Sequence, residues 1–182
     1  MSKEASSTTE EGASQRGERE SIASRVMAFV LTALVWLILD QATKAYFNAQ
    51  SLGGVLGGPY LGLFEFRLAR NTGGAWSIFS DSTMVLAWLS VAICLAVLIF
   101  FIAFMREMTM FTVVSLALVF AGGIGNALDR FINGYVIDFI SPVIIDFPIF
   151  NIADMGITCG IVLLVISLLV NSVQGTPSVE QG

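Results

Sequence analysis

Four long apolar stretches constrain this chain more than any other feature. They run over residues 23–47, 84–105, 108–128 and 152–170, and charged residues occur only near their ends. A helix of about 20 residues crosses roughly 30 Å of hydrocarbon, and it satisfies its backbone polar groups without water. Only 13% of the 182 residues are charged, against about 25% in a soluble domain. The sequence therefore predicts an all-α membrane protein with four transmembrane helices.

The remaining segments have different compositions. Residues 1–22 are rich in Ser, Thr, Glu and Gly, which predicts a disordered tail, and residues 172–182 form a short C-terminal tail. The first span lacks the positive start and small-residue cleavage pattern of a signal peptide, so we expect a retained anchor. Residues 48–82 contain glycine pairs and then a partly alternating stretch, which predicts a small β-containing element on the membrane surface. Residues 23–171 would form one four-helix domain around it.

The topology follows from an even number of spans, which puts both termini on one side. Counting of basic residues favours cytoplasmic termini by a small margin, which makes the β-containing element an extracytoplasmic cradle. The side of the termini carries five basic residues, Lys3, Arg16, Arg19, Arg25 and Arg106, and the opposite side carries four. The net charge of −5 argues against a nucleic-acid partner, which requires a basic surface.

Missing residue types exclude several chemistries. The chain has no histidine, which removes Ser-His and Cys-His catalysis and His-ligated zinc. Its two cysteines, Cys94 and Cys159, each lie inside an apolar run, and we expect both to be small buried hydrophobic side chains. No metal site and no cofactor are predicted.

Polar residues gather at one end of the predicted bundle. Ionisable groups near a bilayer are costly, so they are usually paired and functional. The residues at this end are Asp40, Lys44, Asn71, Asn126, Asp129, Arg130, Asp138, Asn151 and Asp154.

Local structural roles would explain some of these residues individually. Asp40 and Lys44 are four residues apart and can form an ion pair on one helical face, a structural role that we weigh equally with a functional one. Residues 126–130 could clamp the end of the third span. Asn151 could cap the fourth span, with Asp154 interacting favourably with its helix dipole. These roles do not explain why so many polar groups converge.

Asp138 has no obvious local partner and suggests a different role. Small residues at 121–125 and the motif Gly156-x-x-x-Gly160 predict close packing of the third and fourth spans, which would bring Asp138 toward Asp154. Two neighbouring carboxyl groups share a proton. The ionised one can activate water while the protonated one polarises a carbonyl and protonates the leaving nitrogen. The pair therefore predicts aspartic-protease chemistry.

Two alternatives to a peptidase agree less well with the sequence. A small transporter or proton-conducting bundle also uses carboxylates, but it needs them at the membrane midplane among discontinuous helices, and the middles of these spans carry no charge. A purely structural assembly subunit would leave the clustered aspartates unexplained.

Four sequence blocks, in order, resemble the lipoprotein signal peptidase family of bacteria, also called signal peptidase II. The resemblance covers about residues 24–170 and is highly specific because all four blocks occur on four spans. The blocks are Asp40-Gln-Ala-Thr-Lys44, Asn71-Thr-Gly-Gly-Ala75-Trp76-Ser77, Gly122-Gly-Ile-Gly-Asn126-Ala-Leu-Asp129-Arg130 continuing through Gly134 to Phe139, and Phe150-Asn-Ile-Ala-Asp154.

The resemblance implies that Asp138 and Asp154 are the catalytic pair. Because a helix dipole favours an ionised Asp154, we expect Asp138 to carry the shared proton. The residues implied to line or support the site are Asn71, Asn126, Arg130, Asn151, Ala153, Asp40, Lys44 and Asp129.

The resemblance also implies substrate and location. The family cleaves a diacylglyceryl-modified prolipoprotein just before its lipidated cysteine, at the outer face of the bacterial cytoplasmic (inner) membrane. Its surface element helps to cradle the substrate, and its termini are cytoplasmic. The expected partners are the prolipoprotein and membrane lipids, and the chain is expected to act as a monomer. The N-terminal tail matches no motif.

Overall fold

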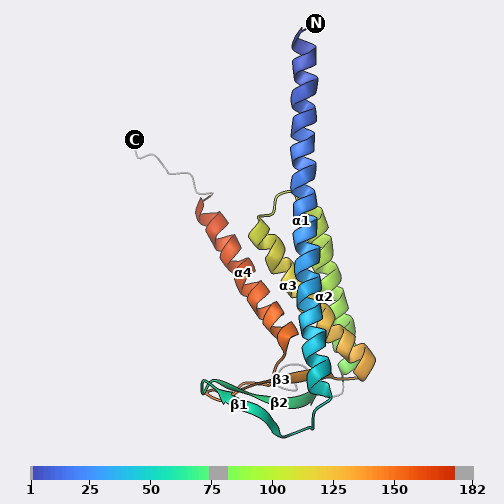
Figure 1. Ribbon diagram of the computed structural model, residues 1–182. Coiled ribbons are helices and arrows are strands. Elements are labelled where there is room, and N and C mark those ends of the chain that lie inside the picture. The colour runs from blue at the N-terminus through green and yellow to red at the C-terminus, as the bar shows by residue number, and fades with distance from the viewer. Residues whose placement is uncertain (1, 74–81, 175–182) are drawn as a thin grey trace.

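The computed structural model describes residues 2–73 and 82–174, with side chains over 21–73 and 82–170. This part of the chain forms four helices and three strands (Figure 1). Each helix contains a segment long and apolar enough to span a membrane, as the sequence predicted. The elements in order are α1 (Ser2–Asn48), β1 (Val55–Tyr60), β2 (Phe64–Asn71), α2 (Thr83–Phe104), α3 (Met110–Asn133), β3 (Val136–Pro142) and α4 (Ile152–Gln174).

The beginning of α1 differs from the sequence prediction. Helix starts at Ser2, where a disordered tail over residues 1–22 was expected, and it runs without a break into the apolar span (Figure 1). Residues 1–22 contain no proline and several Glu, Arg and Ala residues, all of which have favourable helix propensities. The apolar span supplies the costly helix nucleus, and each further residue then adds one hydrogen bond.

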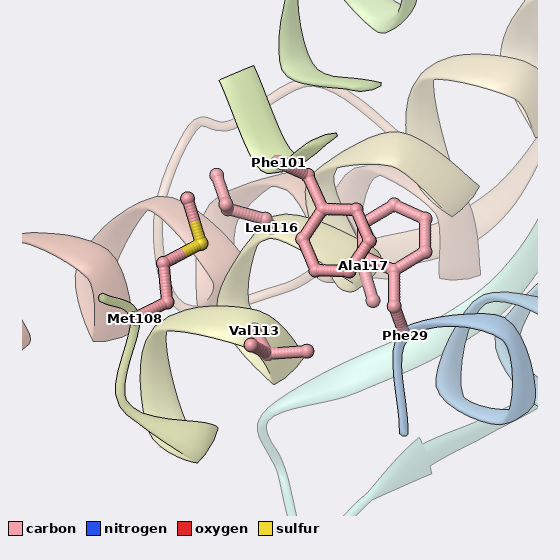
Figure 2. Close-up of a cluster of buried hydrophobic side chains, with 6 residues drawn as sticks. All are labelled: Phe29, Phe101, Met108, Val113, Leu116 and Ala117. Atoms are coloured by element: carbon pink, nitrogen blue, oxygen red, sulfur yellow. The ribbon is translucent and has the colours of Figure 1, made fainter. Parts of the chain in front are cut away.

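Helix α3 is the centre of the bundle, since it packs against α1, α2 and α4. In its most apolar stretch 61% of residues are buried by protein, against 6% to 22% in the other spans. Figure 2 shows part of the resulting core, in which Phe29 of α1 stacks on Phe101 of α2 with ring centroids 4.3 Å apart. The core cluster consists of Phe29, Phe101, Met108, Val113, Leu116 and Ala117.

Glycines let α3 and α4 approach closely, as the sequence predicted. A Cβ atom at Gly122 would collide with the Ala153 carbonyl, and one at Gly160 would lie 2.7 Å from the Ser115 carbonyl oxygen. Gly156 has another role, because it makes room for the indole of Trp36 on α1. The two glycines of the Gly-x-x-x-Gly motif therefore serve two different neighbouring helices.

A three-stranded antiparallel sheet lies across one end of the bundle, in the order β1-β2-β3 (Figure 1). The β1–β2 hairpin falls in the predicted surface element, whereas β3 lies between the third and fourth spans, where no strand was predicted. Phe47 at the end of α1 stacks on Phe139 of β3 with centroids 4.2 Å apart. This contact fixes the sheet against the bundle.

The sequence predicted that both cysteines are buried, and this is correct for only one of them. Cys94 on α2 is 2% exposed, as expected. Cys159 on α4 is exposed, so its predicted burial is wrong. Only 22% of the apolar stretch of α4 is buried by protein, because a membrane helix can present apolar side chains to lipid or to a cavity.

Candidate active site

The ten residues singled out from the sequence meet at the sheet end of the bundle, where α1, α3, β2, β3 and α4 converge. Hydrogen bonds or ion pairs connect all ten into one network. Its members are Asp40, Lys44, Asn71, Asn126, Asp129, Arg130, Asp138, Asn151, Ala153 and Asp154.

One part of the network surrounds Lys44, whose side chain is 1% exposed. Its ammonium Nζ lies 2.9 Å from Asp40 Oδ2, 3.2 Å from Asp129 Oδ2 and 2.9 Å from Asn126 Oδ1. An ammonium has three donors and no acceptor, so all of its protons have partners. The expected pairing of Asp40 with Lys44 is present, and Asp129 is a second counter-charge. We call Asp40, Lys44 and Asp129 the lysine cluster.

The lysine cluster holds the two elements that carry Asp138 and Asp154. Asp40 Oδ1 accepts the Ala153 N–H at 2.9 Å, in the first turn of α4. That N–H has no partner within its own helix. Asp129 Oδ2 accepts the Ile137 N–H at 3.1 Å, one residue before Asp138. Asp40 and Asp129 thus each bind a backbone N–H of an element that carries one of these two aspartates.

Asn126 connects the lysine cluster to Asp154. Because the ammonium of Lys44 can only donate, the amide oxygen of Asn126 must face it. The amide nitrogen Nδ2 then faces the other way and donates to Asp154 Oδ1 at 2.7 Å. A buried lysine therefore sets the orientation of the amide that contacts this carboxylate.

Asn151 connects Asp154 to Asp138. Its Oδ1 accepts the Asp154 N–H at 3.0 Å, and Asp154 Oδ2 accepts the Asn151 N–H at 3.2 Å. This reciprocal pair has the geometry of a capping box at the start of α4. Asn151 therefore caps this helix, the local role suggested by the sequence. The Asn151 Nδ2 group donates to Asp138 Oδ1 at 2.7 Å and to Asn126 Oδ1 at 3.1 Å. Two asparagine amides therefore bridge the two carboxyl groups.

Asp138 lies on β3 and is 2% exposed. Its Oδ2 accepts a hydrogen bond from Asn71 Nδ2 at 3.0 Å, and Asn71 is itself oriented by the Gly73 N–H, which donates to Asn71 Oδ1 at 3.0 Å. Burial, and next the negative charge of Asp154, raise the pKa of Asp138 from 3.8 to about 7. The two asparagine donors act in the opposite direction. Near neutral pH this carboxyl group can therefore hold a proton.

Arg130, in the last turn of α3, is the remaining charged group. It is 8% exposed, and its Nη1 donates to the Asn126 carbonyl oxygen at 3.3 Å. Its buried Nε has no hydrogen-bond partner among the described residues. Asp154, Asp138 and Asp129 all interact with it electrostatically, so it offsets part of their negative charge.

Asp138 and Asp154 both line one cavity of about 470 Å³, a size typical of a small-ligand pocket. Asn71, Asn126 and Arg130 also line it. The remaining wall residues were not assigned to the site from the sequence, although Thr158 lies one helical turn beyond Asp154. They are Val136, Phe147, Pro148, Ile149, Phe150, Met155, Thr158 and Cys159.

Some sequence predictions lie outside this geometry. The motif residues Ala75, Trp76 and Ser77 fall outside the described residues. Among the residues that are described, no three Asp, Glu, Cys or His side chains are grouped as a metal site would need.

One contact between α1 and α4 was not predicted from the sequence. The Trp36 indole N–H donates to the Ile152 carbonyl oxygen at 2.9 Å, at the first residue of α4.

Two amide-bridged carboxyl groups facing one cavity, in a four-span bundle, are the arrangement expected of a membrane-embedded protease of the aspartic type. The family model described as signal peptidase (SPase) II matches residues 32–170. The chain belongs to the signal peptidase II family.

Individual relatives agree with this assignment. A lipoprotein signal peptidase of Nostoc punctiforme is 40% identical over 153 residues, which cover 82% of this chain and 92% of the relative. One from Staphylococcus aureus (strain JH9) is 37% identical over 145 residues, covering 77% and 86%. A solved bacterial membrane enzyme, obtained by the in meso method, superposes with a TM-score of 0.75 at 33% identity, covering 82% and 92%.

Proposed function

We propose that this chain acts as a lipoprotein signal peptidase whose catalytic pair is Asp138 and Asp154. Its substrate would be a diacylglyceryl-modified prolipoprotein, cut just before the lipidated cysteine. One observation carries the proposal: both carboxyl groups line the same cavity, joined by the amides of Asn126 and Asn151. Neither carboxyl group forms a salt bridge within the described part of the chain.

The two carboxyl groups take different roles because their surroundings differ. Asp138 has a pKa raised to about 7 and serves as the protonated acid. Asp154 lies in the first turn of α4, where the helix dipole favours an anion. It also accepts hydrogen bonds from Asn126 Nδ2 and the Asn151 N–H, so it serves as the ionised base.

The reaction follows from these roles. Asp154 takes a proton from a water molecule, whose oxygen adds to the carbon of the scissile carbonyl. Asp138 donates its proton toward the carbonyl oxygen and so stabilises the tetrahedral intermediate. A proton then passes to the leaving nitrogen as the C–N bond breaks. Asn71 and Asn151 each donate a hydrogen bond to one oxygen of Asp138. The carboxyl group is therefore already oriented before the reaction, and no further entropy is lost in positioning it.

The location of the cavity suits a lipid-anchored substrate. It lies where the helices meet the sheet, at the end opposite to the start of α1 and the C-terminal end of α4 (Figure 1). A substrate can keep its acyl chains in the bilayer while its peptide bond meets water at this boundary. We place this end at the outer face of the cytoplasmic membrane, with both termini cytoplasmic, and expect a monomer that contacts membrane lipids directly.

The test is cleavage of a diacylated precursor by the purified full chain in detergent, followed by gel mobility, with the unlipidated precursor as a control. Asp138→Asn and Asp154→Asn should each lower the rate by about 10²–10⁴-fold, the usual worth of a positioned acid or base. Asp146→Asn is the matched control, since Asp146 is exposed in the loop before α4. Substantial cleavage by either dyad variant, or equal cleavage of the unlipidated precursor, would refute the proposal.

A further inference from the structure

The tip of the β1–β2 hairpin carries an apolar side chain where the backbone disfavours one. Residues 60–63 form a turn, closed by the Leu63 N–H, which donates to the Tyr60 carbonyl oxygen at 2.9 Å. The two central residues, Leu61 and Gly62, have φ angles of 52° and 70°. Asparagine, aspartate and glycine are preferred at such positions, because a left-handed backbone crowds the Cβ atom of other residues. Leu61 nevertheless occupies this position, and it is 92% exposed.

A second apolar loop lies beside this tip. The Val143 N–H donates to the Leu63 carbonyl oxygen at 3.0 Å, which joins the loop after β3 to the hairpin. Residues 143–147 read Val-Ile-Ile-Asp-Phe, and all four of their apolar side chains are exposed, Ile144 by 66%. Asp146 is the only charged residue in either segment. We call the exposed apolar residues Leu61, Leu63, Val143, Ile144 and Ile145 the loop patch.

The loop patch continues an apolar surface that belongs to the membrane-spanning bundle. The loop leads into α4, whose most apolar stretch is only 22% buried by protein, so most of the rest of that stretch faces lipid. Phe147 in the loop and Met155 on α4 are both exposed and line the same cavity, which connects the two surfaces. Figure 1 shows the sheet projecting sideways from the end of the bundle, with the hairpin turn at its outer edge. The patch therefore lies beside the bundle, at the level where the spans end.

We propose that the loop patch inserts into the lipid leaflet beside the bundle and holds the sheet at a fixed depth in it. Exposed apolar patches mark interaction surfaces, and apolar side chains gain free energy when they leave water. Lipid is the partner that already covers the neighbouring face of α4, and interfacial segments bind a bilayer through such apolar contacts. The charge of Asp146 disfavours hydrocarbon, so the insertion stops at the boundary between headgroups and acyl chains.

The depth of the sheet matters for the site because the sheet carries part of it. Strand β3 holds Asp138, and β2 holds Asn71, which donates to Asp138 at 3.0 Å. A sheet fixed in the leaflet keeps these two residues at one level relative to a substrate whose acyl chains stay in the same leaflet. This consequence rests on the proposed function, whereas the insertion itself does not.

The first arm of the test measures depth alone. Leu61→Cys and Ile144→Cys, each in the full chain with Cys159→Ser, are labelled with a fluorophore, while Cys94 is buried and stays unlabelled. The protein is placed in vesicles of phosphatidylethanolamine and phosphatidylglycerol. We expect strong quenching by lipids that carry a nitroxide on the acyl chain, and weak quenching by iodide. Glu107→Cys is the control and should show the reverse, because Glu107 is charged and exposed between α2 and α3.

Two results of this arm contradict insertion. Iodide quenching at both patch positions that is as strong as at Glu107 would overturn the proposal, because the patch would then face water. Protection from iodide without quenching by the acyl-chain nitroxide would also overturn it, because a second copy of the chain would then cover the patch.

The second arm compares cleavage of the diacylated precursor in these vesicles and in detergent. Leu61→Asn combined with Ile144→Asn removes the apolar contact with lipid, and asparagine suits the left-handed turn at position 61, so the fold is retained. We expect cleavage in vesicles to fall several-fold, through a higher KM rather than a lower kcat, and cleavage in detergent to change little. Leu61→Met with Ile144→Leu is the matched control and should cleave normally in both media.

The outcomes of the second arm separate the two proposals. An equal loss of cleavage in vesicles and in detergent would overturn the role of the loop patch in presenting the site to a lipid-anchored substrate. No cleavage by the unmutated chain would instead refute the proposed function, while the quenching measurements would still decide whether the patch inserts.

Discussion

Two groups of aspartates lie side by side at the sheet end of the bundle, and they have opposite surroundings. Asp40 and Asp129 share the ammonium of Lys44 and bind backbone N–H groups. Asp138 and Asp154 face a cavity, and their hydrogen-bond donors are asparagine amides and a backbone N–H. The same residue type thus supports the structure in one group and is available for chemistry in the other.

The difference lies in charge compensation. A buried carboxylate beside an ammonium has its charge compensated and its oxygens occupied by hydrogen bonds, so it has little to offer to a substrate. A buried carboxyl group without a counter-charge at hydrogen-bond distance is harder to ionise: burial, and next the negative charge of Asp154, raise the pKa of Asp138 to about 7. Shifts of this kind, in a cavity, are typical of functional sites. Variants that remove a charge or a hydrogen-bond donor from one group test the comparison.

The largest expected effect on stability comes from Lys44→Met. This change leaves Asp40 and Asp129 buried without their counter-charge and removes the donor that orients Asn126. Loss of one partner of a buried ion pair costs about 3–5 kcal/mol, so we expect a large drop in the thermal midpoint in detergent. Asp129→Asn, which still leaves Asp40 beside Lys44, should cost less. An unchanged midpoint for Lys44→Met would show that the lysine cluster does not stabilise the fold.

Asn126→Ala should break the connection between the two groups. The substitution removes the contacts of Asn126 with Lys44, Asp154 and Asn151. Hydrogen bonds to charged groups are worth about 1.5–3 kcal/mol, so cleavage should fall by roughly 10–100-fold. Asn133→Ala, on the same helix, is the control. Equal rates for the two variants would mean that the amide bridge is unimportant for catalysis.

The pH profile should distinguish the two groups. Cleavage should decline as the pH rises through about 7, since Asp138 then loses its proton. Folding raises this pKa from 3.8, so the stability contributed by the protonated form is complete below pH 3.8 and is lost as the pH passes about 7. Asn71→Ala removes a donor to the ionised form, so the basic limb should shift to higher pH. A shift to lower pH would contradict the role of Asn71.

The smallest effect is expected for Trp36→Phe. The indole N–H that reaches the Ile152 carbonyl oxygen is lost, while most of the ring that packs over Gly156 remains. One such hydrogen bond is worth about 1 kcal/mol, so kcat should fall a few-fold with little change in KM. Trp88→Phe is the control, because Trp88 is 65% exposed and contacts Phe131. A change in KM alone would argue against a role of Trp36 in positioning α4.

Much of this protein could be predicted from the sequence because the relevant signals are local. The four spans appear as runs of about 20 apolar residues. The Asp40–Lys44 pair and the Asn151–Asp154 cap each join residues three or four positions apart, a spacing that helical geometry makes visible. The ten site residues were implied by motif blocks, and the structure connects all of them.

Tertiary structure decided the features that join distant segments. Strand β3 forms because β2 pairs with it across more than 60 residues, with Ala69 opposite Asp138. No local sequence pattern predicts this pairing. Packing of α1 against α3 supplied Lys44 with Asp129 and Asn126. The exposure of Cys159 and the cavity it lines also arise only where α4 meets the loop before it. Periodicity along a chain records which face of a helix is apolar, whereas the partner of a buried charge is chosen only when the helices pack.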